Sequence, residues 1–209
     1  MMELLDFVIH IDAHLREFVL THGVWIYALL FAIVFSETGF VVTPFLPGDS
    51  LLFAVGALAA DHLLDVNLAA LTLFVAAVLG NTTNYWIGRW VGPKVFHYED
   101  SRWFKRQHLL AAHAFFEKHG GKAVVFSRFL PIVRTFVPFV AGVGTMDAGR
   151  YAFYNVAGAV AWIASFVGAG FLLGNVPVVK QNLEYLVLLI IVVSVAPVIW
   201  GAWQARRAG

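Results

Sequence analysis

Apolar runs dominate the chain and predict helices of two kinds. Residues 66–88, 151–173 and 184–203 are apolar segments with the length of a membrane-spanning helix, about 20 residues. In residues 4–20, apolar side chains recur at spacings of three and four, and charged side chains take another face. This pattern predicts an amphipathic helix within residues 1–23 that lies in the membrane interface.

Residues 24–60 are also apolar, but they are too long for one span and awkward for two. Pro44, Pro47 and Gly48 interrupt the middle of this stretch and favour a turn. The flanking helices have 12 and 10 residues. They reach roughly 18 and 15 Å, about half of a ~30 Å hydrocarbon core. Half-length helices joined by a turn predict a re-entrant hairpin, whose irregular backbone must be packed in protein or line a wet cavity.

The same feature recurs in residues 123–146, which contain Pro131 and Pro138 among apolar residues and glycines. We interpret this stretch as a second re-entrant hairpin. Its tip is expected near Pro138, as the tip of the first is expected near Thr43. Paired, Pro/Gly-interrupted segments in the two halves of a chain are typical of transporters with a site near the bilayer midplane.

Charge sets the expected topology. Residues 89–122 carry seven Lys and Arg against three Asp and Glu, and they include a second amphipathic pattern. By the positive-inside rule this segment is cytoplasmic, and so is the C-terminus, which holds Arg206 and Arg207. Residues 61–65 are then outside, and the two hairpin-plus-span units have opposite orientations.

Composition supports the same class. The 209 residues are 60% hydrophobic and only 13% charged, whereas a soluble domain has about 25% charged residues. The predicted fold is therefore an all-α polytopic membrane protein with a single domain, residues 1–209. It comprises two inverted units, each a re-entrant hairpin plus a transmembrane helix, with interfacial helices and a C-terminal transmembrane helix.

Several function classes lose support. A net charge of +1 argues against a nucleic-acid partner. The chain has no cysteine and no histidine or carboxylate pattern typical of a metal site, so we expect no cofactor and no metal. It also lacks a phosphate-binding loop and a nucleophile motif. We therefore expect that it is not an enzyme.

Four ionisable residues lie in the predicted hairpins: Glu37, Asp49, Arg128 and Arg134. Charged groups at membrane depth are costly and indicate function. The arginines suit a phosphate headgroup, because guanidinium binds phosphate oxygens bidentately. Burial disfavours a carboxylate and a nearby cation favours it, so either acid could exchange a proton or an arginine partner. The alternative is that acids and arginines pair only to hold the hairpins together.

Polar residues in the predicted spans are weaker candidates. Asn81 and Asn84 are expected to form hydrogen bonds between helices. Asn155, Gly158 and Trp162 share one helix face, for which close packing is the expected role. The residues expected to support the site are Pro44, Pro47, Gly48, Asn81, Tyr85, Arg89, Pro131, Pro138 and Asn155.

Four ordered segments resemble the DedA family of bacterial inner-membrane proteins. They are FSETGFVVTPFLPGDSLLFAVGALA (35–59), GNTTNYWIGRWVG (80–92), FEKHGGKAVVFSRFLPIVRTFVPFVAGVGTM (116–146) and FYNVAGAVAW (153–162). The resemblance implies a transporter-like protein with two re-entrant hairpins that flips polyprenyl phosphates or phospholipids and depends on the proton-motive force. It assigns the embedded acids to Glu37 and Asp49. It assigns the essential arginines to Arg128 and Arg134.

One position departs from the family pattern. Many members have Asp where this chain has Asn81, and asparagine cannot titrate, so a proton role there is in doubt. The predicted function is translocation of a lipid phosphate, undecaprenyl phosphate, coupled to protons in the bacterial inner membrane. The alternatives are a non-transporting assembly or scaffold protein, a phospholipid flippase or scramblase, and a proton-coupled exporter of small cations. The sequence leaves open which lipid is carried and whether the chain forms a homo-oligomer.

Overall fold

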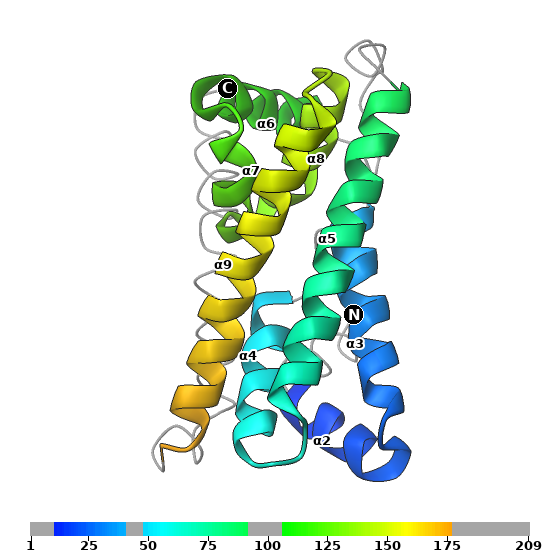
Figure 1. The fold of residues 1–209 in the computed structure, drawn as a ribbon, viewed down its shortest axis with the longest axis vertical. Coiled ribbons are helices and arrows are strands. Elements are labelled where there is room, and N and C mark those ends of the chain that lie inside the picture. Colours follow the sequence, from blue (N-terminus) through cyan, green and yellow to red (C-terminus); the bar gives the residue numbers. More distant parts are fainter. Residues whose placement is uncertain (1–10, 41–47, 92–105, 177–209) are drawn as a thin grey trace, which may run out of the picture. The chain divides into compact units, whose positions relative to one another are not determined.

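The computed structural model describes residues 11–40, 48–91 and 106–176, and these form helices and short connections without a strand (Figure 1). In chain order the elements are α2 (Ile11–His22), α3 (Trp25–Gly39), α4 (Gly48–Ala60), α5 (Val66–Val91), α6 (Arg106–His119), α7 (Lys122–Phe126), the 3₁₀ helix η2 (Ser127–Phe129), α8 (Pro131–Val143) and α9 (Ala148–Gly174). The predicted hairpin turn at residues 41–47 and the predicted span at 184–203 lie outside the described residues.

Within the described ranges, two helices, α5 and α9, are long and apolar enough to cross a membrane. They have 26 and 27 residues, or roughly 40 Å at 1.5 Å per residue. They coincide with the spans predicted at 66–88 and 151–173. The apolar helices α3, α4 and α8 have 15, 13 and 13 residues and reach only roughly 20 Å. The re-entrant arrangement itself stays a prediction.

The turn between α4 and α5 and the turn between α8 and α9 have the same construction. Each contains one left-handed residue, His62 at φ 58° and Thr145 at φ 54°. The residue after it donates its backbone N–H five positions back, from Leu63 to Leu58 and from Met146 to Ala141, as in a Schellman helix end. An aspartate then accepts from the first amides of the next helix, Asp65 for α5 and Asp147 for α9.

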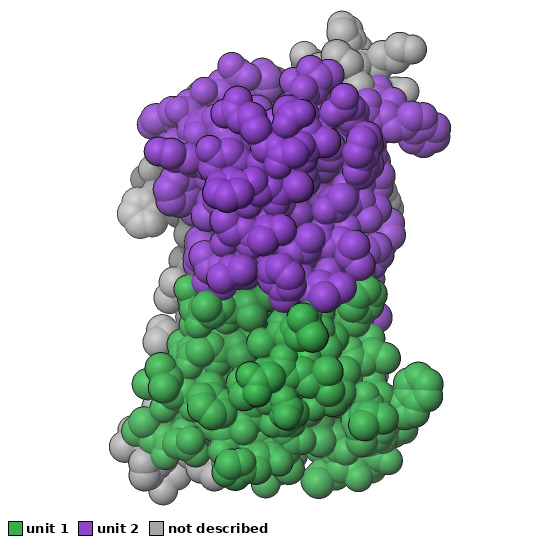
Figure 2. Space-filling view, in the orientation of Figure 1, with its two compact units in different colours: residues 1–31, 47–73, 163–209 green, residues 32–46, 74–162 purple. Residues whose placement is uncertain are grey.

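The chain forms two compact units, which Figure 2 colours separately. Unit 1 comprises residues 1–31, 47–73 and 163–209, and unit 2 comprises residues 32–46 and 74–162. The boundaries fall inside α3, α5 and α9. The units are therefore not the two sequence halves that carry one predicted hairpin each.

In unit 1, α4 packs against the C-terminal part of α9 at glycines. A Cβ atom on Gly56 would lie 2.8 Å from the backbone nitrogen of Phe171, and one on Gly170 would collide with the backbone of Phe53. The two helix backbones are thus in direct contact, which is how small residues let apolar helices associate. Elsewhere in the unit, the Tyr27 hydroxyl accepts a hydrogen bond from the backbone N–H of Asp65 at 3.0 Å.

Unit 2 repeats this packing with α8 and the C-terminal part of α5. A Cβ atom on Gly142 would lie 2.7 Å from the backbone nitrogen of Arg89, and one on Gly88 would collide with the backbone of Phe139. Each short helix therefore packs against the long helix from the other half of the sequence. The repeated turns and the repeated glycine contacts identify an internal structural repeat with exchanged partners.

The break before α8 lies earlier than the sequence pattern suggested. Pro138 lies inside α8, and the backbone is extended instead at Leu130, with φ −119° and ψ 104°. The cause is Pro131, because a residue before proline is pushed out of the helical region, whereas Pro131 at the first helical position needs no N–H partner. The expectation of a turn at Pro138 is wrong.

The glycine contacts predict stability effects that depend on position. Gly142→Ala and Gly56→Ala should each destabilise the protein by about 1–3 kcal/mol, the usual cost of overpacking. Gly168 in α9 is the matched control, because a Cβ there meets nothing within 4 Å. Gly168→Ala should be neutral or stabilising by up to about 1 kcal/mol through helix propensity. Thermal unfolding of the purified protein in detergent measures these differences, and equal melting of Gly142→Ala and Gly168→Ala would contradict the close packing.

Candidate functional site

A small cavity in unit 2 brings together several of the embedded polar residues. It holds about 250 Å³ of space, counting its opening. Its lining comes from α3, α5, η2, α8 and α9 and consists of Glu37, Thr38, Asn81, Arg128, Arg134, Thr135 and Trp162. Glu37, Asn81, Arg128 and Arg134 were singled out by the sequence, and the fold places them at one site.

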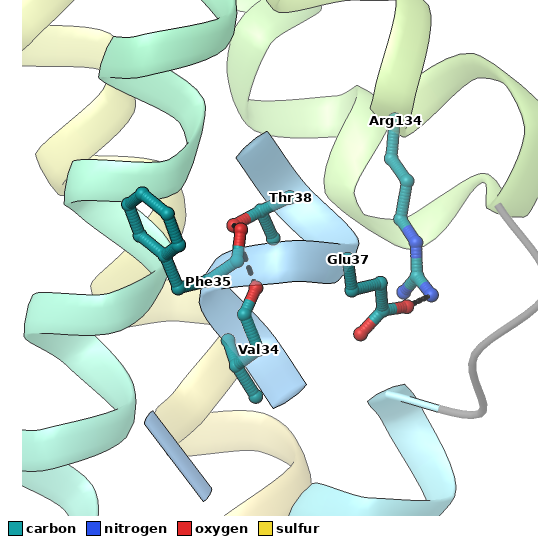
Figure 3. A network of polar contacts seen from close by, with 5 residues as sticks. All are labelled: Val34, Phe35, Glu37, Thr38 and Arg134. Carbon is teal, nitrogen blue, oxygen red and sulfur yellow. Dashed lines mark hydrogen bonds and ion pairs between the residues drawn. The ribbon is translucent and has the colours of Figure 1, made fainter. Parts of the chain in front are cut away.

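Glu37 and Arg134 form an ion pair within this cavity. The Arg134 Nη2 group donates to Oε1 of Glu37, and both side chains are buried. Figure 3 shows the two side chains reaching toward each other, Glu37 from α3 and Arg134 from α8. Burial removes both charges from water, so each charge needs the other to offset the cost of its desolvation. Next to Glu37, the Thr38 hydroxyl donates to the Val34 carbonyl within α3 at 2.8 Å.

Arg128 is held differently, by neutral groups. Its Nη2 group donates to Asn155 Oδ1 at 2.7 Å and to the backbone carbonyl of Ala77 at 3.3 Å. Only 3% of the residue is exposed. No carboxylate in the described part of the chain forms an ion pair with it, and its buried Nε donates to none of those residues. The guanidinium therefore has no carboxylate partner among the described residues and keeps part of its donor capacity inside the cavity.

Trp162 contacts both arginines. The guanidinium carbons of Arg128 and Arg134 lie 5.8 and 5.7 Å from the centre of its ring. A cation over an indole ring is attracted to the negative face of the ring. One buried tryptophan thus offsets part of the repulsion between two neighbouring cations. Gly158 makes room for this arrangement, because a Cβ there would lie 3.1 Å from Cδ of Arg128.

The lining as described carries an excess of positive charge. Two arginines and one glutamate give a formal charge of +1. Helix α8 begins beside them without a side-chain cap, so its first amides and its dipole add positive potential. An uncompensated cation is costly in a buried site. An anion with several acceptor oxygens is the ligand that this arrangement accepts best.

Side chains of α9 tie the site to α5. Asn155 Nδ2 donates to the Val78 carbonyl at 3.1 Å and to Thr82 Oγ1 at 3.2 Å, and the Tyr151 hydroxyl donates to the Asn81 carbonyl at 2.8 Å. Asn155 thus orients Arg128 from a fixed position, a role beyond the helix packing that its sequence context suggested.

Some residues of the site were missed by the sequence pattern. Thr38 and Thr135 directly follow Glu37 and Arg134 in the chain. This position next to a charged residue was the only feature of the sequence that could have marked them as site residues. Trp162 and Gly158 were recognised as one face with Asn155, but their contact with Arg128 was not. Gly158 does pack closely, since a Cβ there would be 3.1 Å from the Val125 Cα atom.

Tyr85 and Arg89 form a second polar cluster, away from the cavity lining. The Tyr85 hydroxyl donates to the Met146 carbonyl, and Arg89 Nη1 donates to the Tyr85 hydroxyl at 2.8 Å. Tyr85 also stacks on Tyr151 at 4.2 Å between ring centres. These contacts join the end of α5 to the turn between α8 and α9, so they support the fold around the site.

The remaining sequence candidates lie elsewhere. Asp49 is buried in the first turn of α4, where its charge suits the helix N-terminus, and it belongs to unit 1. Gly48 is the first residue of that helix. Pro44 and Pro47 lie outside the described residues. In the described ranges, no group of three His, Cys, Asp or Glu side chains is arranged to hold a metal ion.

Comparison with known proteins gives the family. The sequence model of the VTT domain family matches residues 46–172. The chain is 50% identical over 207 residues to Protein DedA of Escherichia coli, a match that covers 98% of this chain and 94% of that protein. It is 43% identical over 176 residues to an uncharacterized membrane protein of Mycobacterium leprae, covering 84% and 79%. It is 33% identical over 176 residues to inner membrane protein YqjA of Escherichia coli, covering 84% and 80%. No solved structure matches the chain.

The all-helical fold, the two membrane-length apolar helices and these matches define a helical membrane protein with a VTT domain. The chain belongs to the DedA family.

The ion pair predicts a double-substitution effect. Glu37→Gln alone leaves Arg134 buried without its carboxylate partner, which should destabilise the protein by about 3–5 kcal/mol. Adding Arg134→Gln removes the stranded charge and should recover much of that loss. Thermal unfolding of the parent, both single variants and the double variant measures the coupling. Additive losses, or a Glu37→Gln variant as stable as the parent, would mean that the pair contributes little.

Proposed function

We propose that this protein translocates a lipid phosphate across the bacterial inner membrane, with undecaprenyl phosphate as the substrate and the proton-motive force as the driving force. In this proposal the protein is a multi-pass transporter with a cytoplasmic C-terminus, and it is not an enzyme. The observation that carries the proposal is the buried Arg128 guanidinium, which lines the cavity and is held by neutral groups among the described residues.

Arg128 has the chemistry of a fixed phosphate anchor. Its hydrogen bonds to the described residues all leave from Nη2. The remaining donors, Nη1 and the buried Nε, point to different sides of the planar guanidinium, and each can donate to an oxygen of a bound anion. Asn81 adds a neutral amide to the same lining, where it can donate to a phosphate oxygen but cannot titrate.

In this proposal, the Glu37–Arg134 ion pair is the part of the site whose partners change when the substrate binds. An entering phosphate competes with Glu37 for Arg134. A displaced carboxylate left unpaired at membrane depth costs about 2.5–3.5 kcal/mol even on insertion scales. Protonation of Glu37 removes that cost, so phosphate binding is linked to proton uptake. Asp49, which is also buried, is proposed as a second proton-exchanging group.

The size of the cavity restricts what enters it. The cavity is too small for a long isoprenoid chain, so in this proposal the chain stays in the lipid and the headgroup makes room for itself by displacing Glu37 from Arg134. Exposed apolar side chains follow the long helices, for example Leu71 and Leu79 on α5 and Phe153 and Val160 on α9. In this proposal the headgroup is recognised by the arginines, and the chain slides along apolar surface.

The second candidate is a scaffold protein, and the ion pair itself favours it. A buried Glu–Arg pair can serve only to fix two helices. This alternative explains Glu37 and Arg134 but gives no role to the Arg128 charge, which no carboxylate of the described residues neutralises. A measurement of phosphate binding therefore distinguishes a lipid-phosphate transporter from a scaffold protein.

Binding across pH tests the proposal. The purified protein should bind a short-chain polyprenyl phosphate and not the matching polyprenol, and a phospholipid tests whether the headgroup class is broader. Because a proton is taken up with the phosphate, binding should strengthen as pH falls, by up to about tenfold per pH unit. Glu37→Gln should retain only the pH dependence of the phosphate itself. Arg128→Lys should weaken binding about 10- to 100-fold through the loss of charge-assisted hydrogen bonds.

Arg150→Lys is the matched control, since Arg150 is exposed and does not line the cavity. Its binding should equal that of the parent. Full binding by Arg128→Lys would contradict phosphate anchoring. An unchanged pH dependence in Glu37→Gln would contradict proton coupling through this residue and leave anchoring intact.

A further inference from the structure

One face of α5 lies against both helices that carry the ion pair. Gly80, Asn84 and Gly88 are spaced by four residues and therefore share a face. A Cβ on Gly80 would lie 3.0 Å from the Phe35 carbonyl of α3, and one on Gly88 would lie 3.0 Å from the Cα atom of Phe139 of α8. The two glycines bring α3 and α8 close to α5, with Asn84 between the contacts.

Asn84 bridges these two helices. It is fully buried, and its Nδ2 group donates to the Thr38 carbonyl at 3.3 Å and to the Thr135 carbonyl at 2.8 Å. Thr38 directly follows Glu37, and Thr135 directly follows Arg134. The amide thus holds the backbone next to each member of the ion pair, and its side chain forms no hydrogen bond with either charged side chain.

Both carbonyls that accept from Asn84 lie in helix turns with incomplete backbone hydrogen bonding. Thr38 is in the last turn of α3, where carbonyls lack an intrahelical donor. Thr135 lies in the turn that Pro138 weakens, because Pro138 has no N–H to give the Arg134 carbonyl. Asn84 Oδ1 is buried and accepts no hydrogen bond from the described residues, a cost that a residue kept only for packing would avoid.

We infer that Asn84 is a positioning residue that keeps Glu37 and Arg134 in ion-pair geometry. This inference deepens the proposed function, because the pair that Asn84 positions is the proposed proton switch. Without the bridge, the end of α3 and the start of α8 lose their shared donor. Glu37 then spends more time away from Arg134 and is more readily protonated, because it loses the ion pair that favours its carboxylate. The other cation on the cavity lining, Arg128, stays held by Asn155.

The reactivity of Glu37 toward a hydrophobic carbodiimide, which modifies protonated carboxyl groups, tests this role without any lipid substrate. Labelling of Glu37 and of Asp49 is quantified by mass spectrometry from pH 5 to 8 in the purified full-length protein. In Asn84→Ala, Glu37 labelling at neutral pH should rise at least about fivefold, within the range for coupled residues, and its pH profile should move upward. Labelling of Asp49, which lies in the other unit, should stay as in the parent and reports general loosening.

Thr83→Ala is the matched control, because the Thr83 hydroxyl donates only within its own helix, to the Leu79 carbonyl at 2.9 Å. It should label as the parent does. In an Arg134→Gln background, where the pair is already broken, Asn84→Ala should change Glu37 labelling less than twofold. Unchanged Glu37 labelling in Asn84→Ala, or a rise shared equally by Asp49, would overturn the inference. Either outcome is independent of phosphate binding, so it is distinguishable from failure of the proposed function.

Discussion

The burial of two arginine side chains beside one glutamate is the constraint on which the rest of unit 2 depends. Charged groups among apolar helices are stable only when donors, acceptors and counter-charges surround them. Arg134 receives a carboxylate, whereas Arg128 receives an asparagine, a backbone carbonyl and an indole face. The two arginines are therefore chemically unequal: among the described residues, Arg134 has a carboxylate partner and Arg128 has none.

Close helix packing makes this arrangement possible. Glycines at the crossings of α5 with α3 and α8 remove the side chains that would hold these helices apart. The same glycine contacts recur between α4 and α9 in unit 1.

Part of the fold and of the candidate site could be predicted from the sequence. Apolar length identified α5 and α9, and the rarity of charge in apolar segments identified Glu37, Arg128 and Arg134. The pairing could not be predicted, because local pattern carries no information on which helices meet. For the same reason the exchanged partners of α4 and α8 and the shared contact of Trp162 with both arginines were missed. The prediction that Asn84 forms hydrogen bonds between helices is confirmed, but its acceptors, the Thr38 and Thr135 carbonyls, could not be predicted. The error at Pro138 had a different cause: two prolines offered the same signal, and only Pro131 has the extended residue before it.

The central claim is that the unequal arginines bind a lipid phosphate and carry it between leaflets. Leaflet translocation in proteoliposomes tests it most directly, with a short-chain polyprenyl phosphate, the matching polyprenol and a phospholipid as separate cargoes. The account predicts that the parent protein moves the polyprenyl phosphate faster under an imposed pH gradient and does not move the polyprenol. It also predicts that Arg128→Lys and Arg134→Lys each impair the movement. Absence of translocation by a well-folded parent, or full activity in both lysine variants, would contradict the account.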